Sequence, residues 1–512
     1  MKLKVMAGRE NLWQTVREQQ PELPSYCGGN GSCGKCRVRV ISGETSVSTA
    51  DRKYLSEQEI ADGYRIACQS RPMTECEIEV LSVGEDKMQV LNVEKSEAVT
   101  NQKKMCAAPC SIAIDIGTTT LAFALLNASG EVIETVQGLN HQRSFGADVI
   151  SRIEQAVKGR QTELTECIRR DIRQGIKALL EQAELPLTAV SRIAVAGNTT
   201  MEQMFFGLAV DDLGKYPFMP FTNDFLESNY GQLFTLTEEW EQGAETLPVT
   251  GFPCIAGFVG GDITAGLYEL TGSKQEGLQM FLDIGTNGEL ACIRGDRIVT
   301  ASTAAGPVFE GGNISCGIGC IPGAVFATRI REETLECKTI DNCQAQGICG
   351  SGLIEAVADM LELGIVDSSG LMKQAYHKHG YVLARTDAGK TVALTQADIR
   401  EFQMAKAAVA AGIDMLQKQL GAESGEITSY LLAGGFGSGL SVNKTIKTGL
   451  LPKNARGKTR SVGNTSLKGA VRLLREGEAG RKRIYEMLAV TEHIHLANTE
   501  AFEACYISHM NF

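Results

Sequence analysis

Residues 111–126 read SIAIDIGTTTLAFALL, and this stretch decides the fold of most of the chain. It predicts an apolar strand ending at Asp115, a Gly-Thr turn and a second apolar strand. The same design recurs in residues 279–293, QMFLDIGTNGELACI, where Asp283 ends the first strand. A duplicated strand-turn-strand unit predicts two related halves that enclose one ligand.

Both turns have the composition of phosphate-binding loops. Small residues admit phosphate to backbone N–H groups, threonine hydroxyls donate to phosphate oxygens, and aspartates hold Mg²⁺ through its waters. We therefore expect phosphate groups and Mg²⁺ at Asp115, Asp283 and the turn residues Gly117, Thr118, Thr119, Thr120, Gly285, Thr286, Asn287 and Gly288. For a single copy, an aspartate at a strand end is equally well explained as an ordinary turn residue.

A third element, SYLLAGGFGSGLSVNKTI at residues 429–446, predicts a strand, a glycine turn and a helix. Its turn residues, which would let a planar group lie against bare backbone, are Gly434, Gly435, Phe436 and Gly437. A GGFG run alone is also an ordinary tight turn. In the order hairpin, hairpin, glycine turn, the set resembles the phosphate and adenosine motifs of the acetate and sugar kinase, heat-shock chaperone and actin superfamily. The resemblance implies ATP and an α/β actin-like ATPase with two ribonuclease H-like halves.

Between the hairpins, residues 257–270, GFVGGDITAGLYEL, predict a helix with Asp262 as its N-cap. In heat-shock and actin members, a Glu or Gln of the connecting helix orients the attacking water, and Asp262 sits at that place. The resemblance therefore implies a catalytic role for Asp262, with a plain helix cap as the alternative. Glu310, in the glycine-rich stretch 304–312, is a second candidate ranked below it.

Cysteines near the start of the chain have the spacing of an iron-sulfur site. Residues 25–40, SYCGGNGSCGKCRVRV, contain a C-x5-C-x2-C pattern, and a further cysteine follows in RIACQ. Three thiolates in one loop and a fourth from a distance are typical of a plant-type [2Fe-2S] cluster. The predicted ligands are Cys27, Cys33, Cys36 and Cys68. A zinc knuckle is the alternative, although zinc sites usually pair two C-x2-C units.

The surrounding sequence predicts a small sheet domain. Residues 1–5 and 37–41 alternate as strands, and Leu12, Trp13 and Val16 share one helical face. Cys76 competes with Cys68 as fourth ligand, but its alternation with Ile78 and Val80 predicts a core thiol. The whole resembles vertebrate-type and bacterial [2Fe-2S] ferredoxins, which implies an α+β β-grasp fold.

Length and composition set the domain organisation. A chain of 512 residues is too long for one core, and residues 84–110 are polar and aperiodic like a tether. We expect a ferredoxin domain at 1–83, a linker at 84–110 and an ATPase domain at 111–512. The halves of the ATPase domain are expected at about 111–260 and 261–512.

Charge and cysteine usage exclude several function classes. The net charge of -11 disfavours nucleic acid and anionic membranes as partners. The first residues lack the apolar region of a signal peptide and no run is long enough to span a membrane, so we expect a cytoplasmic protein. Sixteen cysteines are then thiols and metal ligands rather than disulfides. Among them, Cys316, Cys320 and Cys349 form an incomplete metal-ligand set.

The combination resembles the reductive activators of corrinoid proteins. The motifs that carry this resemblance are GADVISRI (146–153), AGNTTMEQMF (196–205), DIGTNGE (283–289), AAGPVFEGG (304–312), GICGSGLIEAV (347–357) and LLAGGFGS (431–438). It implies that an inactive Co(II) corrinoid protein of a methyltransferase system is returned to Co(I) at the expense of ATP. A low-potential electron donor is then required, and a homodimer is compatible with this function.

Two other functions fit the same residues. A kinase for a small acid, with the ferredoxin as redox sensor, would produce ADP only with an acceptor. A nucleotide-gated electron-transfer or chaperone-like binding module would work without significant turnover, so a substitution at Asp262 would leave its activity intact.

Overall fold

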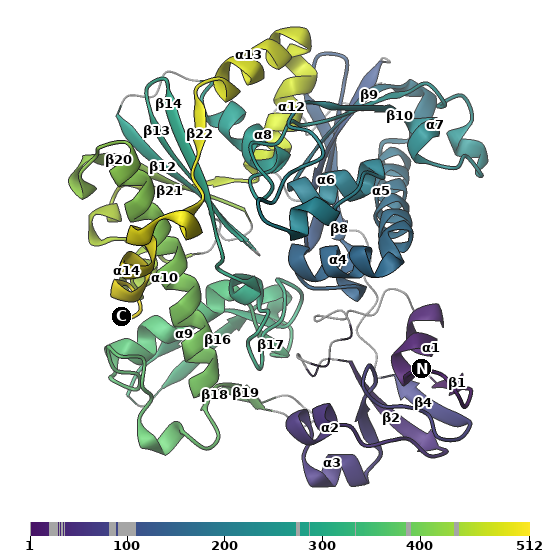
Figure 1. Cartoon of the computed structure of the whole chain (residues 1–512), viewed down its shortest axis with the longest axis vertical. Helices are drawn as coiled ribbons and strands as arrows, with labels where there is room; N and C mark the ends of the chain where they lie inside the picture. The colour runs from purple at the N-terminus through teal and green to yellow at the C-terminus, as the bar shows by residue number, and fades with distance from the viewer. Residues whose placement is uncertain are drawn as a thin grey trace. The chain divides into compact units, whose positions relative to one another are not determined.

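The computed structural model describes residues 2–19, 29, 31, 34, 36–80, 89–90, 109–272, 277–285, 287–332, 334–385, 391–434 and 440–512. The chain divides into two compact units. Unit 1 comprises Met1–Asp262 and Ala470–Gly477, and unit 2 comprises Ile263–Gly469 and Glu478–Phe512. Figure 1 shows the chain and labels many of its helices and strands.

The first part of unit 1 is a small α+β domain whose sheet has the order β1-β4-β2-β3, with antiparallel neighbours. Its elements are β1 (Lys2–Val5), α1 (Leu12–Gln19), β2 (Arg37–Ser42), α2 (Thr49–Tyr54), α3 (Glu57–Ala61), β3 (Tyr64–Ile66) and β4 (Cys76–Val80). Leu12, Trp13 and Val16 of α1 are buried in the same hydrophobic cluster as Val38 and Ile78. The predicted apolar face of this helix is confirmed.

The rest of unit 1 is built on a mixed sheet with the order β10-β11-β9-β6-β7-β8-β5. The strands are β5 (Gln89–Val90), β6 (Cys110–Ile116), β7 (Thr120–Leu126), β8 (Val132–Leu139), β9 (Val190–Gly197), β10 (Leu226–Asn229) and β11 (Pro248–Gly251). The helices are α4 (Val149–Gln155), α5 (Gln161–Ala183), α6 (Thr199–Phe206) and α7 (Tyr230–Leu233). Helix α5 packs on β7 and β8, and its apolar side chains join the core of this sheet.

The main sheet of unit 2 has the order β21-β20-β12-β13-β14-β22. Its strands are β12 (Leu278–Ile284), β13 (Gly288–Arg294), β14 (Arg297–Thr303), β20 (Ile427–Ala433), β21 (Thr459–Gly463) and β22 (Thr491–His493). Two smaller sheets contain β15 (Ala324–Ile330), β16 (Leu335–Thr339), β17 (Gly347–Ile348), β18 (Tyr381–Arg385) and β19 (Thr391–Leu394). The helices are α9 (Gly350–Glu362), α10 (Gln396–Gln419), α11 (Val442–Lys447), α13 (Glu478–Leu488) and α14 (Glu500–Ser508), while α8 (Gly261–Leu270) and α12 (Thr465–Glu476) span the boundary of the units.

The two large sheets repeat one topology. In unit 1, β6, β7 and β8 form an antiparallel meander, and β9 and β11 continue the sheet in parallel beside β6. In unit 2, β12, β13 and β14 form the meander, and β20 and β21 continue it in parallel beside β12. The predicted fold class, with two related α/β halves after a ferredoxin domain, is confirmed.

Two local features differ from the sequence-based expectation. Gln89 and Val90, inside the segment predicted as a tether, pair with Gln137 and Val136 and add a short edge strand to the sheet. Helix α8 begins at Gly261, so Asp262 lies in its first turn and is not the N-cap. A carboxylate in the first turn still interacts favourably with the helix dipole, which explains why the pattern resembled a cap.

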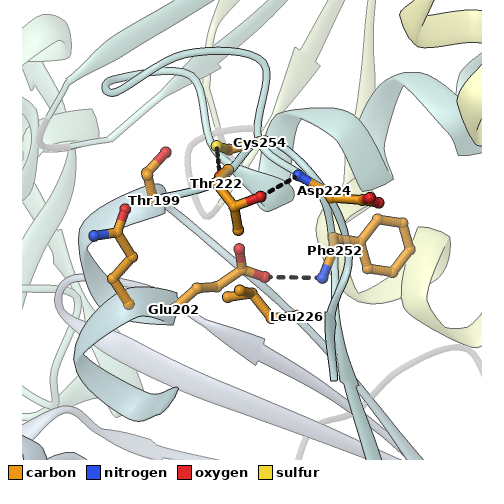
Figure 2. A pocket seen from close by; sticks show the side chains of 8 residues that line it. Thr199, Glu202, Thr222, Asp224, Leu226, Phe252 and Cys254 are labelled. Atoms are coloured by element: carbon orange, nitrogen blue, oxygen red, sulfur yellow. Dashed lines mark hydrogen bonds between the residues drawn. The ribbon is translucent and has the colours of Figure 1, made fainter. Parts of the chain in front are cut away.

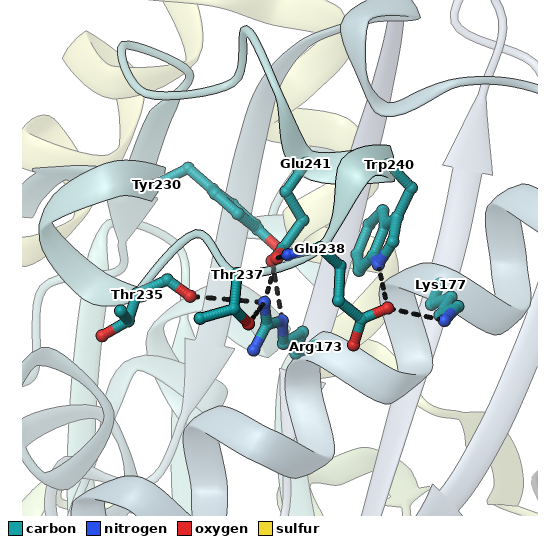
Figure 3. A network of polar contacts seen from close by, with 8 residues as sticks. All are labelled: Arg173, Lys177, Tyr230, Thr235, Thr237, Glu238, Trp240 and Glu241. Atoms are coloured by element: carbon teal, nitrogen blue, oxygen red, sulfur yellow. Dashed lines mark hydrogen bonds and ion pairs between the residues drawn. The ribbon is translucent and has the colours of Figure 1, made fainter.

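A buried ion pair attaches the segment after α7 to helix α5 (Figure 3). Arg173 of α5 donates through both Nε and Nη2 to the carboxylate of Glu241, which is fully buried. The Tyr230 hydroxyl donates to Glu241 Oε1 at 2.9 Å. Burial, followed by the neighbouring Glu241 charge, raises the pKa of Tyr230, so the phenol keeps the proton that it donates.

Replacing Glu241 with Gln should destabilise unit 1. Glu241 is fully buried but the Arg173 side chain is 22% exposed, so the guanidinium stays partly hydrated after the change. The expected cost is that of a hydrogen bond to a charged group, about 1.5–3 kcal/mol. Urea denaturation followed by Trp240 fluorescence would report the change. The exposed neighbour Glu239 provides the control, and E239Q should leave the midpoint unchanged. Equal midpoints for E241Q and E239Q would contradict a stabilising role for the pair.

Candidate functional site

The structure describes two of the four predicted cluster ligands, and it places them together. Cys36 directly precedes β2 and Cys68 follows β3. The Ala67 N–H donates to the Cys36 carbonyl at 2.8 Å, and both cysteines are at least 95% buried. A Cβ added to Gly29 would lie 3.9 Å from Cys68 Cβ, so Gly29 lies beside Cys68. This arrangement fits a cluster held by both segments, while Cys27 and Cys33 lie outside the described residues.

Cys76 is a core thiol, as predicted. It lies in β4, is 2% exposed, and its Sγ donates to the carbonyls of Glu44 and Thr74 at 3.2 and 3.1 Å. Burial raises the pKa of the Cys76 thiol. A protonated, engaged thiol is a poor competitor for a metal.

A buried carboxylate that the sequence reasoning missed holds the turn of Cys68. Asp51 accepts from the Ile66 N–H at 2.5 Å and from the Ser70 hydroxyl at 2.9 Å, on either side of Cys68. It also accepts from the Ser48 N–H at 2.6 Å, which closes a capping box at the start of α2. The S-x-x-D pattern at residues 48–51 was a readable helix signal, but its contact with the cysteine turn depends on the tertiary fold.

The first predicted phosphate turn joins β6 to β7. The Gly117 N–H donates to the Thr120 carbonyl at 2.9 Å, and a Cβ at Gly117 would lie only 2.6 Å from that oxygen. Buried Asn140 donates to the Gly117 carbonyl at 2.9 Å, and fully buried Arg152 donates to the Thr118 carbonyl at 2.6 Å. These two side chains, which the sequence analysis did not single out, support the turn from the protein interior.

Helix α6 begins beside the same turn. The Asn198 side chain accepts from the Met201 N–H at 3.0 Å as the N-cap, and its amide donates to Thr118 Oγ1 at 3.1 Å. Because β6 and β9 are parallel, with Asp115 opposite Ala196, Asp115 and the start of α6 lie at one edge of the sheet.

The start of α8 packs on the start of α6. The Thr199 hydroxyl donates to the Ala256 carbonyl at 2.9 Å, and a Cβ at Gly260 would lie 2.4 Å from the Thr199 nitrogen. Only glycine permits this approach. It brings the first turn of α8, with Asp262, to the edge of the sheet where β6 and β9 end.

A third carboxyl of unit 1 interacts electrostatically with both predicted aspartates, Asp115 and Asp262. Glu202 of α6 is 2% exposed and accepts from the Phe252 N–H at 3.2 Å (Figure 2). A Cβ at Gly261 would meet both of its oxygens at 2.6 and 2.7 Å. Burial, followed by the negative charges of Asp262 and Asp115, raises the pKa of Glu202 well above its ordinary value. The raised pKa favours the protonated form of Glu202 beside the two aspartates. The available sequence signal for Glu202 was its position four residues after the Asn198 cap.

A small pocket opens beside Glu202 (Figure 2). Its lining residues are Thr199, Glu202, Gln203, Thr222, Asp224, Leu226, Phe252 and Cys254. Burial raises the pKa of Cys254 to about 12, and its thiol donates to the Thr222 carbonyl at 3.2 Å. Cys254 is thus an engaged thiol and not a nucleophile.

Unit 2 brings together the second aspartate and the start of the glycine turn. Asp283 pairs in register with Ala433, and a Cβ at Gly434 would lie 3.0 Å from Asp283 Oδ1. Gly434 has a φ of +79°, a conformation that favours glycine. Gly435, Phe436, Gly437 and Thr286 lie outside the described residues.

Glu310 also lies at the second phosphate turn. The Gly285 N–H donates to the Asn287 carbonyl at 2.9 Å, which closes the turn before Gly288 begins β13. A Cβ at Gly285 would lie 3.4 Å from Glu310 Oε1. Each unit thus has a candidate catalytic carboxylate near its phosphate turn: Asp262 in unit 1 and Glu310 in unit 2.

Two of the three cysteines predicted as an incomplete metal set contact each other. The Cys320 thiol donates to the sulfur of Cys349, which lies at the N-terminus of α9. This hydrogen bond lowers the pKa of Cys349. The Cys349 thiol itself donates to the Val325 carbonyl at 3.4 Å, so hydrogen bonds within the protein engage both thiols.

Replacing Asp51 with Asn should loosen the turn of Cys68. A hydrogen bond to a charged group is worth about 1.5–3 kcal/mol, so cluster loss to a chelator should be at least about tenfold faster. The decay of visible absorbance under anaerobic conditions measures this rate. Asp62 is exposed, and D62N serves as the control; an unchanged rate in D51N would rule out this support.

Replacing Glu202 with Gln should change the pH dependence of stability. A carboxyl whose pKa is raised by folding keeps its proton in the folded state, whereas the unfolded chain releases it above about 4.5. Wild-type stability is therefore complete below this pH and falls as pH rises toward the folded-state pKa. The glutamine side chain of E202Q does not titrate. The free energy of unfolding of E202Q relative to that of the wild type should therefore rise by about 1.4 kcal/mol per pH unit across that window.

Denaturation of both proteins at a series of pH values would measure this difference. E181Q, at an exposed position of α5, is the control that should track the wild type. A stability difference between E202Q and wild type that is constant with pH would show that Glu202 is ionised in the folded protein.

Three family models cover the chain. Residues 2–73 match the 2Fe-2S iron-sulfur cluster binding domain, residues 110–274 match the RACo middle region, and residues 277–512 match the C-terminal domain of RACo, the ASKHA domain. The first match is to an iron-sulfur domain and the last is to an ATPase and sugar-kinase type of fold. No helix among the described residues has both the length and the apolar character needed to cross a membrane.

Named relatives match most of the chain. Corrinoid activation enzyme RamQ of Eubacterium limosum is 31% identical over 78% of this chain and 70% of its own length. The [Co(II) methylated amine-specific corrinoid protein] reductase of Methanosarcina barkeri is 24% identical over 78% of this chain and 76% of its own length. A solved structure titled reductive activator for corrinoid, iron-sulfur protein aligns with a TM-score of 0.70 and 26% identity, covering 99% of this chain and 96% of that one. The chain belongs to the family of corrinoid activation enzymes, in which an iron-sulfur domain is joined to an ASKHA domain.

Proposed function

We propose that this protein is an ATP-dependent reductive activator that returns an inactive Co(II) corrinoid protein of a methyltransferase system to Co(I). One observation carries the proposal: a single chain joins an iron-sulfur domain to an ASKHA body and is 31% identical to a corrinoid activation enzyme over 78% of its length. An electron-transfer domain and a nucleotide-binding body in one chain suit a reduction that needs an energy supply.

The proposed nucleotide site uses the turns at both strand ends. Asp115 and Asp283 would hold Mg²⁺ through its waters, and Asp262 would orient the attacking water. The proposed phosphate-binding residues are Gly117, Thr118, Thr119, Thr120, Gly285, Thr286, Asn287 and Gly288. The proposed adenosine-binding residues are Gly434, Gly435, Phe436 and Gly437.

Glu202 supports the assignment of Asp262. A charged neighbour would repel both the ATP phosphates and the Asp262 carboxylate, whereas a protonated Glu202 adds no negative charge. Asp262 can then stay ionised close to the γ-phosphate. Phosphoryl transfer depends mainly on positioning and electrostatics, so one carboxylate and Mg²⁺ suffice for slow hydrolysis.

The proposed cluster ligands are Cys27, Cys33, Cys36 and Cys68. When bound, a [2Fe-2S] cluster supplies one-electron transfer. The protein contributes the fixed Cys36 and Cys68 segments and the Asp51 hydrogen bonds that hold the Cys68 turn.

ATP provides the energy for an unfavourable electron transfer in this proposal. A deficit of ~200 mV costs roughly 5 kcal/mol, at ~2.3 kcal/mol per 100 mV. Moving a two-state equilibrium from 1:99 to 99:1 requires about 5.5 kcal/mol. A nucleotide-driven change of this size in the complex with the corrinoid protein would make the transfer favourable.

The remaining elements of the proposal concern partners and compartment. In this proposal the protein works in the cytoplasm and receives electrons from a low-potential donor. A homodimer is the first oligomeric state to test. The net charge of -11 favours a corrinoid partner with a complementary basic patch.

The test is the absorbance of a purified Co(II) corrinoid protein mixed with this protein, reductant and ATP. Wild-type protein should produce Co(I), and D262N should lower both ATP hydrolysis and Co(I) formation by at least about 100-fold. The exposed aspartate Asp212 gives the control variant D212N, which should behave as wild type.

Other outcomes separate the alternatives. ATP hydrolysis without Co(I), for every co-encoded corrinoid protein, would reject the activator. ADP production that requires a small acid would favour the kinase. Full Co(I) formation by D262N would favour a nucleotide-gated module without significant turnover.

A further inference from the structure

Helices α10 and α14 of unit 2 pack against each other and place three different metal-ligating side chains together. Cys505 and His509 are four residues apart, so they lie on one face of α14 and its C-cap. Asp414 faces them from α10. The ligand atoms of these three residues all lie within 4.8 Å of one another.

We propose that Asp414, Cys505 and His509 bind a zinc-class divalent cation that fastens α14 to α10. The site belongs to none of the nucleotide or cluster residues described above. It would be a structural metal site of the ASKHA domain.

The distances suit a small cation. His509 Nε2 lies 2.9 Å from Asp414 Oδ2, and Cys505 Sγ lies 3.9 Å from the same oxygen. Around tetrahedral zinc, with bonds of ~2.0–2.3 Å, these separations are about 3.3 and about 3.6 Å. The two distances to Asp414 therefore differ from the tetrahedral values by less than about half an ångström.

The donor set selects the kind of metal. Thiolate, imidazole and carboxylate together are the ligands of zinc, whereas Mg²⁺ and Ca²⁺ take oxygen ligands. The Asp414 and His509 side chains are 36% and 30% exposed, so water can reach the fourth position. Cys505 is 9% exposed, so it is the most buried of the three residues.

The surrounding charges are consistent with binding. Desolvation, followed by Asp414, raises the pKa of Cys505, whereas Lys418 opposes this effect. In the absence of metal the sulfur is therefore protonated, and a cation would displace one thiol proton to the solvent on binding. The Cys505 thiolate and the Asp414 carboxylate would then balance the two positive charges of the ion.

Other contacts hold the residues after α14 in place without this site. Gln403 of α10 donates to the Met510 carbonyl at 2.9 Å, and the Phe512 N–H donates to the Ser368 carbonyl at 2.8 Å. The Phe512 ring stacks on Phe402 with 6.1 Å between centroids. Loss of the metal should therefore loosen α14 without unfolding unit 2, which allows ligand variants to be tested in the full chain.

The experiment measures zinc in the full-length, cluster-containing protein after equilibration with a zinc buffer and gel filtration. We expect one zinc per chain, and zinc-edge X-ray absorption should show one sulfur at ~2.3 Å with nitrogen or oxygen at ~2.0 Å. The iron of the cluster does not contribute at this edge. C505A should lose the sulfur scatterer and bind zinc at least about tenfold more weakly, whereas C343A, at an exposed cysteine, should match the wild type.

A second pair of variants tests the zinc site without changing the buried Cys505. H509Q should also lose zinc, and H379Q, at an exposed histidine, should keep it. Cluster absorbance and ATP binding report correct folding of each variant. If C505A does not fold, H509Q and D414N carry the test, because both side chains are partly exposed.

Three results would overturn the proposal. The first is that the wild type retains no zinc. The second is that C505A and H509Q retain as much zinc as the wild type, and the third is that the zinc coordination shell lacks sulfur. Zinc should also slow hydrogen exchange in α14 of the wild type but not of H509Q. Co(I) formation is a separate readout, so failure of the metal site and failure of the activator function are distinguishable.

Discussion

The parallel pairing of β6 with β9, and of β12 with β20, determines where the polar residues of both halves lie. The first strand of each meander is buried on both faces, with Ile114 and Leu282 fully inaccessible. If the pairing register of this strand shifted by one residue, the Asp115 or Asp283 side chain would enter the apolar core. Burial of the strand therefore fixes the register. The carboxylates, the adjacent turns and the helices that follow the parallel strands must therefore meet at the ends of the strands. The rest of the proposed nucleotide site depends on this constraint.

Several carboxyls lie close together at one strand end of unit 1, and the raised pKa of Glu202 favours its protonated form there. Among Asp115, Glu202 and Asp262, Glu202 is the most buried, and the negative charges of the two aspartates oppose its ionisation. Keeping this proton reduces the repulsion around Asp115 and Asp262. Gly260 and Gly261 make the arrangement possible, because any side chain there would collide with α6.

The sequence predicted the features that depend on local pattern. Strand alternation and strand-end aspartates predicted the meanders, and the helical face of Leu12, Trp13 and Val16 was confirmed. Asp51 and Glu202 were missed, because an S-x-x-D cap and a helical glutamate are common, and only tertiary contacts give them a role. The Asp414, Cys505 and His509 group was missed because Asp414 lies 91 residues before Cys505 along the chain. Gln89 and Val90 were taken as linker, since a two-residue edge strand has no periodicity to detect.

The separate cores constrain how the proposed activator could couple ATP to electron transfer. The ferredoxin domain, the large sheet of unit 1 and the large sheet of unit 2 each have their own hydrophobic cluster, so each part can keep its fold while its partners change. Coupling must then be a difference in binding free energy between nucleotide states and not a partial unfolding. Such coupling is reciprocal: if ATP tightens the complex with the corrinoid protein by some factor, that protein tightens ATP by the same factor. Factors of 5–150, which correspond to about 1–3 kcal/mol, are typical of allosteric proteins. They fall short of the roughly 5 kcal/mol needed for a ~200 mV deficit, so the remainder would have to come from hydrolysis and product release.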